Sequence, residues 1–134
     1  MKHLFTLTAA IEAGTGLALL AAPAAAVQLL LGAEIAGAAF PLGRVAGAAL
    51  LALGVACWLT RSDCLSHGSR GLVVAMLLYN FCTAAVLGEA GIRSSTAGAV
   101  LWLAVILHAA MAAWCVLCIL RRQENVRSSQ SGQA

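Results

Sequence analysis

Four long apolar segments, separated by short polar ones, dominate the pattern along this chain. They cover residues 4–22, 36–60, 71–92 and 98–120. Each approaches the roughly 20 apolar residues that a helix needs to cross the hydrocarbon core of a bilayer. None shows the strict polar and apolar alternation that is typical of a membrane β-barrel strand. The pattern therefore predicts an all-α protein, an integral membrane four-helix bundle.

Short polar or helix-breaking segments mark the ends of these spans. Pro23 ends the first span, because proline lacks the backbone N–H that would continue the helix. The apolar stretch 24–31 is too short to cross, so we expect it either to form a short interfacial helix or to extend the first span past a kink. The segment 62–70 is the clearest polar loop. We assign residues 1–122 to one transmembrane domain and expect residues 123–134 to be a disordered tail.

The composition also favours lipid as the surrounding medium. Hydrophobic residues make up 62% of the chain and charged residues 10%, and the mean hydropathy is +0.94. A soluble domain of this size could not bury so much apolar surface. The net charge of +3 comes from basic residues beside the spans, not from a patch interleaved with aromatic residues, which excludes nucleic-acid binding. We expect a multi-pass protein of the cell (inner) membrane, with the lipid bilayer as its first partner.

The distribution of lysine and arginine predicts the orientation in the membrane. Basic residues in short loops are retained in the cytoplasm. Outside the spans, one side has Arg93 alone, whereas the other side has Lys2, Arg61, Arg70, Arg121, Arg122 and Arg127. We therefore expect both termini and the loop 62–70 to be cytoplasmic.

The first segment also has features of a cleavable secretory signal. Lys2 precedes an apolar stretch, and the small-residue run APAAA around Pro23 is similar to a cleavage site. Glu12, however, lies in the middle of that stretch, where a charge weakens insertion. We expect the segment to be retained as the first span.

Polar side chains within the spans are few, and an ionisable group costs about 2.5–3.5 kcal/mol at the centre of a membrane helix. At about 1.5 Å per residue from the cytoplasmic end, Glu12 and Asn80 lie at about 12 Å and His108 at about 18 Å. We expect these three residues to meet in one polar layer. Two interpretations stay open: an interhelical hydrogen-bond network that locks the bundle, or a site that relays protons or binds a small ligand.

Arg44 also lies within a span, and its side chain stays protonated and needs a partner. Glu89 matches Arg44 in depth, at about 26 Å against about 24 Å. Helical phase places Glu89 opposite Asn80, so both cannot point inward. Glu12 is the alternative partner, in which case Glu89 reaches the headgroups. The sequence leaves both pairings open.

A ridge of small residues marks the second span. Ala39, Gly43 and Gly47 follow one another at intervals of four, which lets another helix backbone approach closely. We expect close helix packing there, either within the chain or with a second copy.

Four of the five cysteines fall near the cytoplasmic end: Cys57, Cys64, Cys115 and Cys118. Cys115 and Cys118 are three residues apart and share a helix face, so their thiols could act together in redox chemistry or hold a metal. The other interpretation is that they are small buried apolar residues, which the reducing cytoplasm favours.

Three segments carry resemblances to known families. The runs RVAGAALLALGVACWLTR, LVVAMLLYN and WCVLCILRR resemble uncharacterised small bacterial four-helix membrane proteins, a domain of unknown function, which implies architecture alone. The run LTAAIEAGTG resembles the first helix of small multidrug resistance transporters, which implies that Glu12 is a proton and cation site, although Arg44 has no counterpart there. The Cys115 and Cys118 pair is similar to that of quinone-coupled four-helix thiol oxidoreductases, which work on the oxidising face.

The chain has no catalytic triad and no phosphate-binding loop, so we expect neither an enzyme nor a cofactor. The leading prediction is a structural or accessory subunit, in a larger membrane complex or a homo-oligomer. The alternative is a proton-coupled transporter or binder of a small hydrophobic or cationic molecule that uses Glu12, Asn80 and His108. A second alternative is thiol redox chemistry or metal binding through Cys115 and Cys118.

Overall fold

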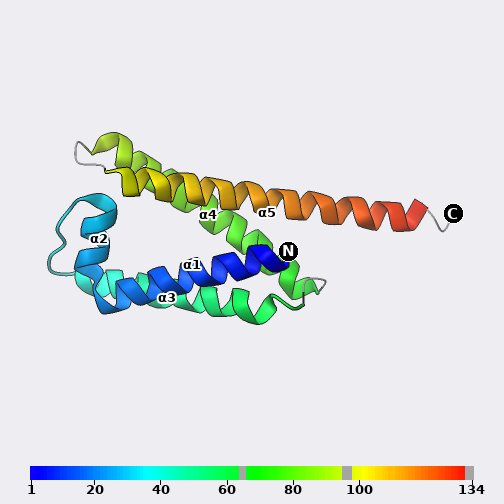
Figure 1. Cartoon of the computed structure of the whole chain (residues 1–134), viewed down its shortest axis with the longest axis horizontal. Coiled ribbons are helices and arrows are strands. Elements are labelled where there is room, and N and C mark those ends of the chain that lie inside the picture. The colour runs from blue at the N-terminus through cyan, green and yellow to red at the C-terminus, as the bar shows by residue number, and fades with distance from the viewer. Residues whose placement is uncertain (64–65, 95–97, 132–134) are drawn as a thin grey trace.

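Five helices make up the part of the chain that the computed structural model describes, which is residues 1–63, 66–94 and 98–131 (Figure 1). They are α1 (Lys2–Ala21), α2 (Pro23–Leu31), α3 (Ala39–Thr60), α4 (His67–Arg93) and α5 (Ala99–Ser131). All but the short α2 are long and apolar enough to cross a membrane. The described residues contain no strand, so the all-α prediction is confirmed.

The breaks between the first helices follow from proline and glycine. Pro23 lies at the start of α2, where its missing N–H costs nothing, and Ala22 before it leaves the helical conformation at φ −142° and ψ 66°. Gly32 ends α2 with a φ of 65°, a left-handed conformation that favours glycine, and its N–H bonds to the carbonyl of Gln28. The predicted short helix after the first span is therefore present and separate from α1.

The four long helices are arranged as two antiparallel pairs (Figure 1). In the first hairpin, α1 packs along α3, and in the second hairpin α4 packs along α5. The two hairpins meet where α1 and α4 begin and diverge toward α2 (Figure 1). We call the meeting end, with Lys2, Arg61 and Arg70, the basic end, and the opposite end, with α2, the far end.

The first hairpin is packed backbone to backbone through small residues. A Cβ added to Gly47 would lie 2.8 Å from the carbonyl oxygen of Gly16, and one added to Gly54 would lie 2.9 Å from the nitrogen of Ala13. A Cβ added to Gly43 would lie 3.1 Å from the side-chain Cβ of Pro23. Such close approach needs residues without bulky side chains. The small-residue ridge of α3 thus packs within the chain, against α1 and α2, and Ala39 lies half-buried at its start.

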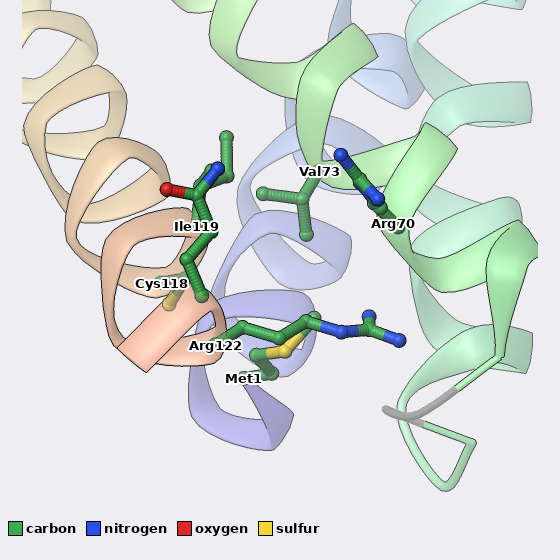
Figure 2. Close-up of a pocket in the computed structure, with 7 residues that line it drawn as sticks. Met1, Arg70, Val73, Cys118, Ile119 and Arg122 are labelled. Atoms are coloured by element: carbon green, nitrogen blue, oxygen red, sulfur yellow. The ribbon is translucent and has the colours of Figure 1, made fainter. Parts of the chain in front are cut away.

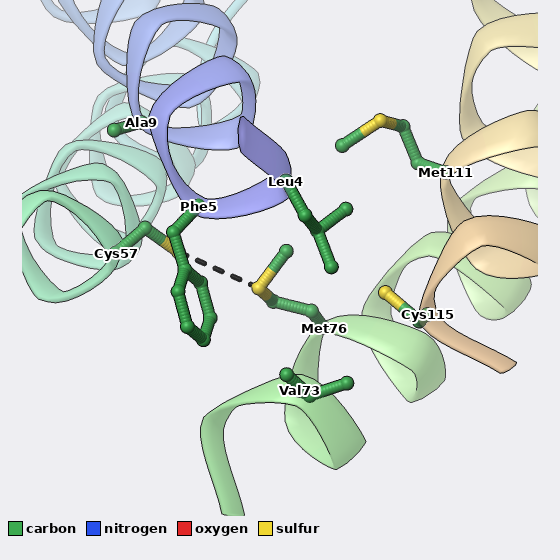
Figure 3. Packing of buried hydrophobic residues seen from close by; sticks show 8 residues of the cluster. All are labelled: Leu4, Phe5, Ala9, Cys57, Val73, Met76, Met111 and Cys115. Carbon is green, nitrogen blue, oxygen red and sulfur yellow. Dashed lines mark hydrogen bonds between the residues drawn. The ribbon is translucent and has the colours of Figure 1, made fainter. Parts of the chain in front are cut away.

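The two hairpins share one apolar core at the basic end. Figure 3 shows side chains of both hairpins converging there, with Cys57 Sγ lying 3.5 Å from Met76 Sδ. The cluster contains Leu4, Phe5, Ala9, Cys57, Val73, Met76, Met111 and Cys115. This core joins all four long helices at the basic end, whereas at the far end the contact between the hairpins is made by α2 against α5.

Much of the remaining apolar surface faces outward. Ile92 is 80% exposed and Leu59 70%, and both belong to helices that could span a membrane. Exposed apolar area of this extent marks contact with lipid or with another protein.

The helix bounds differ from the prediction mainly in α4 and α5. The helix α4 begins at His67, inside the segment predicted as a loop, because Ser66 caps it by accepting a hydrogen bond from the N–H of Ser69. The helix α5 continues to Ser131, so residues 123–131 are helical where we expected a disordered tail. Residues 132–134 lie outside the described part of the chain.

Candidate functional site

A buried carboxyl group joins the two hairpins. Glu12 of α1 is only 3% exposed, and its Oε2 accepts a hydrogen bond of 3.1 Å from the hydroxyl of Tyr79 on α4. A buried polar group without a partner is costly, so this bond matters for how the hairpins meet. Tyr79 thus satisfies the carboxyl group that the sequence placed in the first span.

A second hydrogen bond joins α4 to α5. His108 Nδ1 lies 2.8 Å from Asn80 Oδ1, and Asn80 Nδ2 donates to the carbonyl oxygen of Met76 at 2.8 Å. Because the amide oxygen of Asn80 can only accept, the proton of this bond belongs to His108 Nδ1. The arrangement therefore assigns to His108 a form with a proton on Nδ1.

Ring contact connects these two bonds into one group. The rings of Tyr79 and His108 meet edge to face, with centroids 5.6 Å apart and an interplanar angle of 84°. We call Glu12, Tyr79, Asn80 and His108 the polar cluster. It draws residues from α1, α4 and α5. It lies about one helical turn beyond the apolar core, on the side away from the basic end.

Three of these four residues were predicted from the sequence to share a polar layer, and Tyr79 was not. The positions of Glu12, Asn80 and His108 along their spans predicted similar depths for the three residues. The structure places Asn80 and His108 in direct contact. Glu12 reaches them only through Tyr79. The available signal was that Tyr79 precedes Asn80 and carries a hydroxyl group, which usually finds a hydrogen-bond partner when it is buried.

One more polar atom lies close to the cluster along α1. Thr8, one turn before Glu12, is 1% exposed, and its hydroxyl has no hydrogen-bond partner among the described residues. A buried hydroxyl without a protein partner is a place where an ordered water can bind.

Arg44 and Glu89 do not pair with each other. Glu89 forms a salt bridge of 2.9 Å with Arg93, one turn further along α4, and both side chains are exposed. Arg44 is exposed on α3. Glu12 bonds to Tyr79 instead, so neither of the two partners considered for Arg44 contacts it within the described residues.

The cysteines are only partly brought together. Cys57 and Cys115 are buried in the apolar core, Cys118 is half-buried beside it, and all three are free thiols. Cys64 lies outside the described residues. Among the residues that the structure describes, no group of three histidine, cysteine or acidic side chains is placed to hold a metal ion.

Two cavities lie at opposite ends of the bundle. The basic-end cavity has a volume of about 330 Å³ and is lined by Met1, Arg70, Val73, Cys118, Ile119, Arg122 and Gln123 (Figure 2). The far-end cavity has a volume of about 360 Å³ and is lined almost wholly by apolar groups of α1, α2 and α5, namely Gly14, Thr15, Ala18, Leu19, Ala26, Val27, Leu29, Leu30 and Val100. Thr15 lies about one turn beyond Glu12 on α1, but none of the four residues of the polar cluster lines the far-end cavity.

Comparison of the chain with protein-family models, with curated proteins and with solved structures finds no match.

Proposed function

We propose that this chain is a multi-pass protein of the bacterial inner membrane that serves as a structural or accessory subunit, with both termini in the cytoplasm. The outward apolar surface of its four long helices supports a lipid environment. The basic residues at the basic end, which include Lys2, Arg61 and Arg70, support a cytoplasmic location of that end. The small four-helix family that the sequence resembles has the same proposed architecture.

The observation that carries the structural role is that the polar side chains inside the bundle bond to one another. Glu12 bonds to Tyr79, and Asn80 bonds to His108. Interhelical hydrogen bonds of this kind contribute about 0.6–2 kcal/mol each in membrane bundles. The Glu12–Tyr79 bond would thus hold the two hairpins together, and the Asn80–His108 bond would hold α4 to α5 within the second hairpin.

The accessory role is supported by the apolar surface of α3, which the other helices do not cover. The helix α3 buries little beyond the glycine face that meets α1, and it presents large side chains such as Trp58 and Leu59 outward. Arg44 is exposed on the same helix. Such a surface offers a neighbouring subunit both apolar area and one positive charge.

Purification from native membranes tests the accessory role. The chain, tagged at its own expression level and extracted in mild detergent without crosslinking, should bring down one larger membrane protein at constant stoichiometry. An Arg44→Leu variant should lose that partner, whereas Arg93→Leu, which removes an exposed arginine at the far end, should keep it. Recovery of a solitary homo-oligomer at native expression would contradict the role.

A second candidate is a proton-coupled binder or transporter of a small hydrophobic or cationic molecule. The observation that favours it is the far-end cavity, which has an apolar lining and includes Thr15, about one turn from Glu12 on α1. The resemblance of LTAAIEAGTG to the first helix of small multidrug resistance transporters points the same way. In this candidate, Glu12 exchanges a proton for the bound cation.

Binding of tetraphenylphosphonium to the purified chain separates the two candidates. A carrier should release protons when this hydrophobic cation binds, and Glu12→Gln should abolish both binding and release. Equal binding by the wild type and Glu12→Gln, without proton release, would remove the second candidate and leave the structural role.

A further inference from the structure

The basic-end cavity combines an apolar wall with two guanidinium groups. Arg70 on α4 and Arg122 on α5 both line it, together with Val73 and Ile119 (Figure 2). Figure 2 shows Arg122 reaching from α5 across Met1. No acidic side chain is among the described residues that line the cavity. Its volume, about 330 Å³, lies within the range of about 300–1,000 Å³ that is usual for small-molecule sites.

Two arginines at one cavity favour a particular ligand chemistry. The guanidinium group is planar and binds phosphate oxygens through paired hydrogen bonds, which makes arginine the residue most suited to phosphate recognition. Two such groups lining one cavity give it a positive charge, which attracts an anion. The cavity is therefore suited to a phosphate-bearing anion.

The apolar wall decides between a free anion and a lipid. Met1, Val73, Cys118 and Ile119 give the cavity far more apolar than polar surface, which a free phosphate ion would not use. Basic pockets between membrane helices on the cytoplasmic side are suited to the headgroups of anionic lipids. A ligand with a phosphate head and an apolar body fits both parts of the lining.

We propose that the basic-end cavity binds the headgroup of an anionic phospholipid of the cytoplasmic leaflet. Arg70 and Arg122 hold the phosphate, and Val73 and Ile119 contact the first apolar part of the lipid. Met1 belongs to the first hairpin and the other lining residues to the second, so the bound lipid touches both hairpins at their junction. The proposal rests on the cytoplasmic placement of the basic end, and it does not depend on an accessory partner.

Native mass spectrometry of the detergent-purified chain tests this site. Phosphatidylglycerol should bind at least tenfold more tightly than phosphatidylcholine, and inorganic phosphate should not displace it. Arg70→Gln and Arg122→Gln should each weaken phosphatidylglycerol binding at least tenfold. Arg121→Gln removes the same charge from the residue next to Arg122, outside the cavity, and should change binding less than twofold.

Further variants guard against a fold defect. Arg70→Lys keeps the positive charge and should bind more tightly than Arg70→Gln, and circular dichroism should show equal helix content in all variants. Equal affinity for phosphatidylglycerol and phosphatidylcholine, or equal losses in Arg121→Gln and Arg122→Gln, would overturn the proposal. Displacement by millimolar inorganic phosphate would also overturn it, because the site would then be one for free anions. Since only the purified chain is used, failure here leaves the proposed subunit role standing.

Discussion

Tyr79 on α4 donates a hydrogen bond of 3.1 Å to the buried carboxyl group of Glu12 on α1, and this bond links the two hairpins. The hairpins also meet through the apolar core at the basic end and through α2 against α5 at the far end. The Glu12–Tyr79 bond therefore lies between two apolar contacts and adds a polar one to the interface of the hairpins.

Tyr79→Phe should destabilise the bundle by about 1–3 kcal/mol, because it leaves the buried carboxyl of Glu12 without its donor. Glu12→Leu removes the same bond from the other side, so the double variant should lose less than the sum of the two single losses. Unfolding in mixed micelles measures all three. Strictly additive losses would show that the two side chains do not interact.

Glu12→Gln should keep the stability of the wild type to within about 1 kcal/mol, because the amide oxygen of glutamine still accepts from Tyr79. Glu12→Leu has no acceptor and should unfold more readily. The same micelle assay compares the two variants. A loss in Glu12→Gln as large as in Glu12→Leu would mean that the carboxyl group itself, and not its acceptor oxygen, holds the hairpins.

Gly47→Ala should destabilise the first hairpin by about 1–3 kcal/mol, the usual cost of overpacking. Its new Cβ would lie 2.8 Å from the Gly16 carbonyl oxygen and 2.9 Å from the Leu20 nitrogen, both backbone atoms. Gly14→Ala is the matched control on α1, since nothing lies within 4 Å of its Cβ. The control should be neutral or stabilising by up to about 1 kcal/mol. Equal effects at both positions would contradict the packing of α1 against α3.

His108 should carry a proton on Nδ1, the nitrogen that faces Asn80 Oδ1. Nitrogen-15 NMR of the chain in lipid reports the protonation of each ring nitrogen, and His3→Gln with His67→Gln removes the two other, exposed histidines. Asn80→Ala should change the Nδ1 resonance. A neutral ring with its proton on Nε2 alone would contradict the assigned bond.

The long helices and part of the polar cluster could be predicted from the sequence. Run length alone placed the four long helices, and Pro23 marked the break before α2. The similar depths of Asn80 and His108 along their spans predicted that they lie close together, because residues at one level of a bundle with short loops are neighbours. The structure has them in contact. Tyr79 was not predicted, because only the ionisable and amide side chains within the spans were considered as members of a polar layer.

Which helices pack against each other could not be predicted from the sequence. Helices in lipid are apolar on most faces, so hydrophobic periodicity does not show which face meets which neighbour. The small-residue ridge with Gly47 indicated close packing, but nothing in the sequence named Gly16 as its partner. The Glu89–Arg93 salt bridge could have been predicted, because an acidic residue commonly pairs with a basic one four residues later on a helix.

Reporter fusions at successive points in the chain test most directly the claim that the four helices cross the membrane with both ends inside. Fluorescent protein fused after Asp63 or at the C-terminus should fold and fluoresce, and alkaline phosphatase fused after Ser94 should be active in the periplasm. Phosphatase activity at Asp63 or at the C-terminus would contradict the proposed orientation. Recovery of the chain in buffer without detergent would contradict membrane insertion itself.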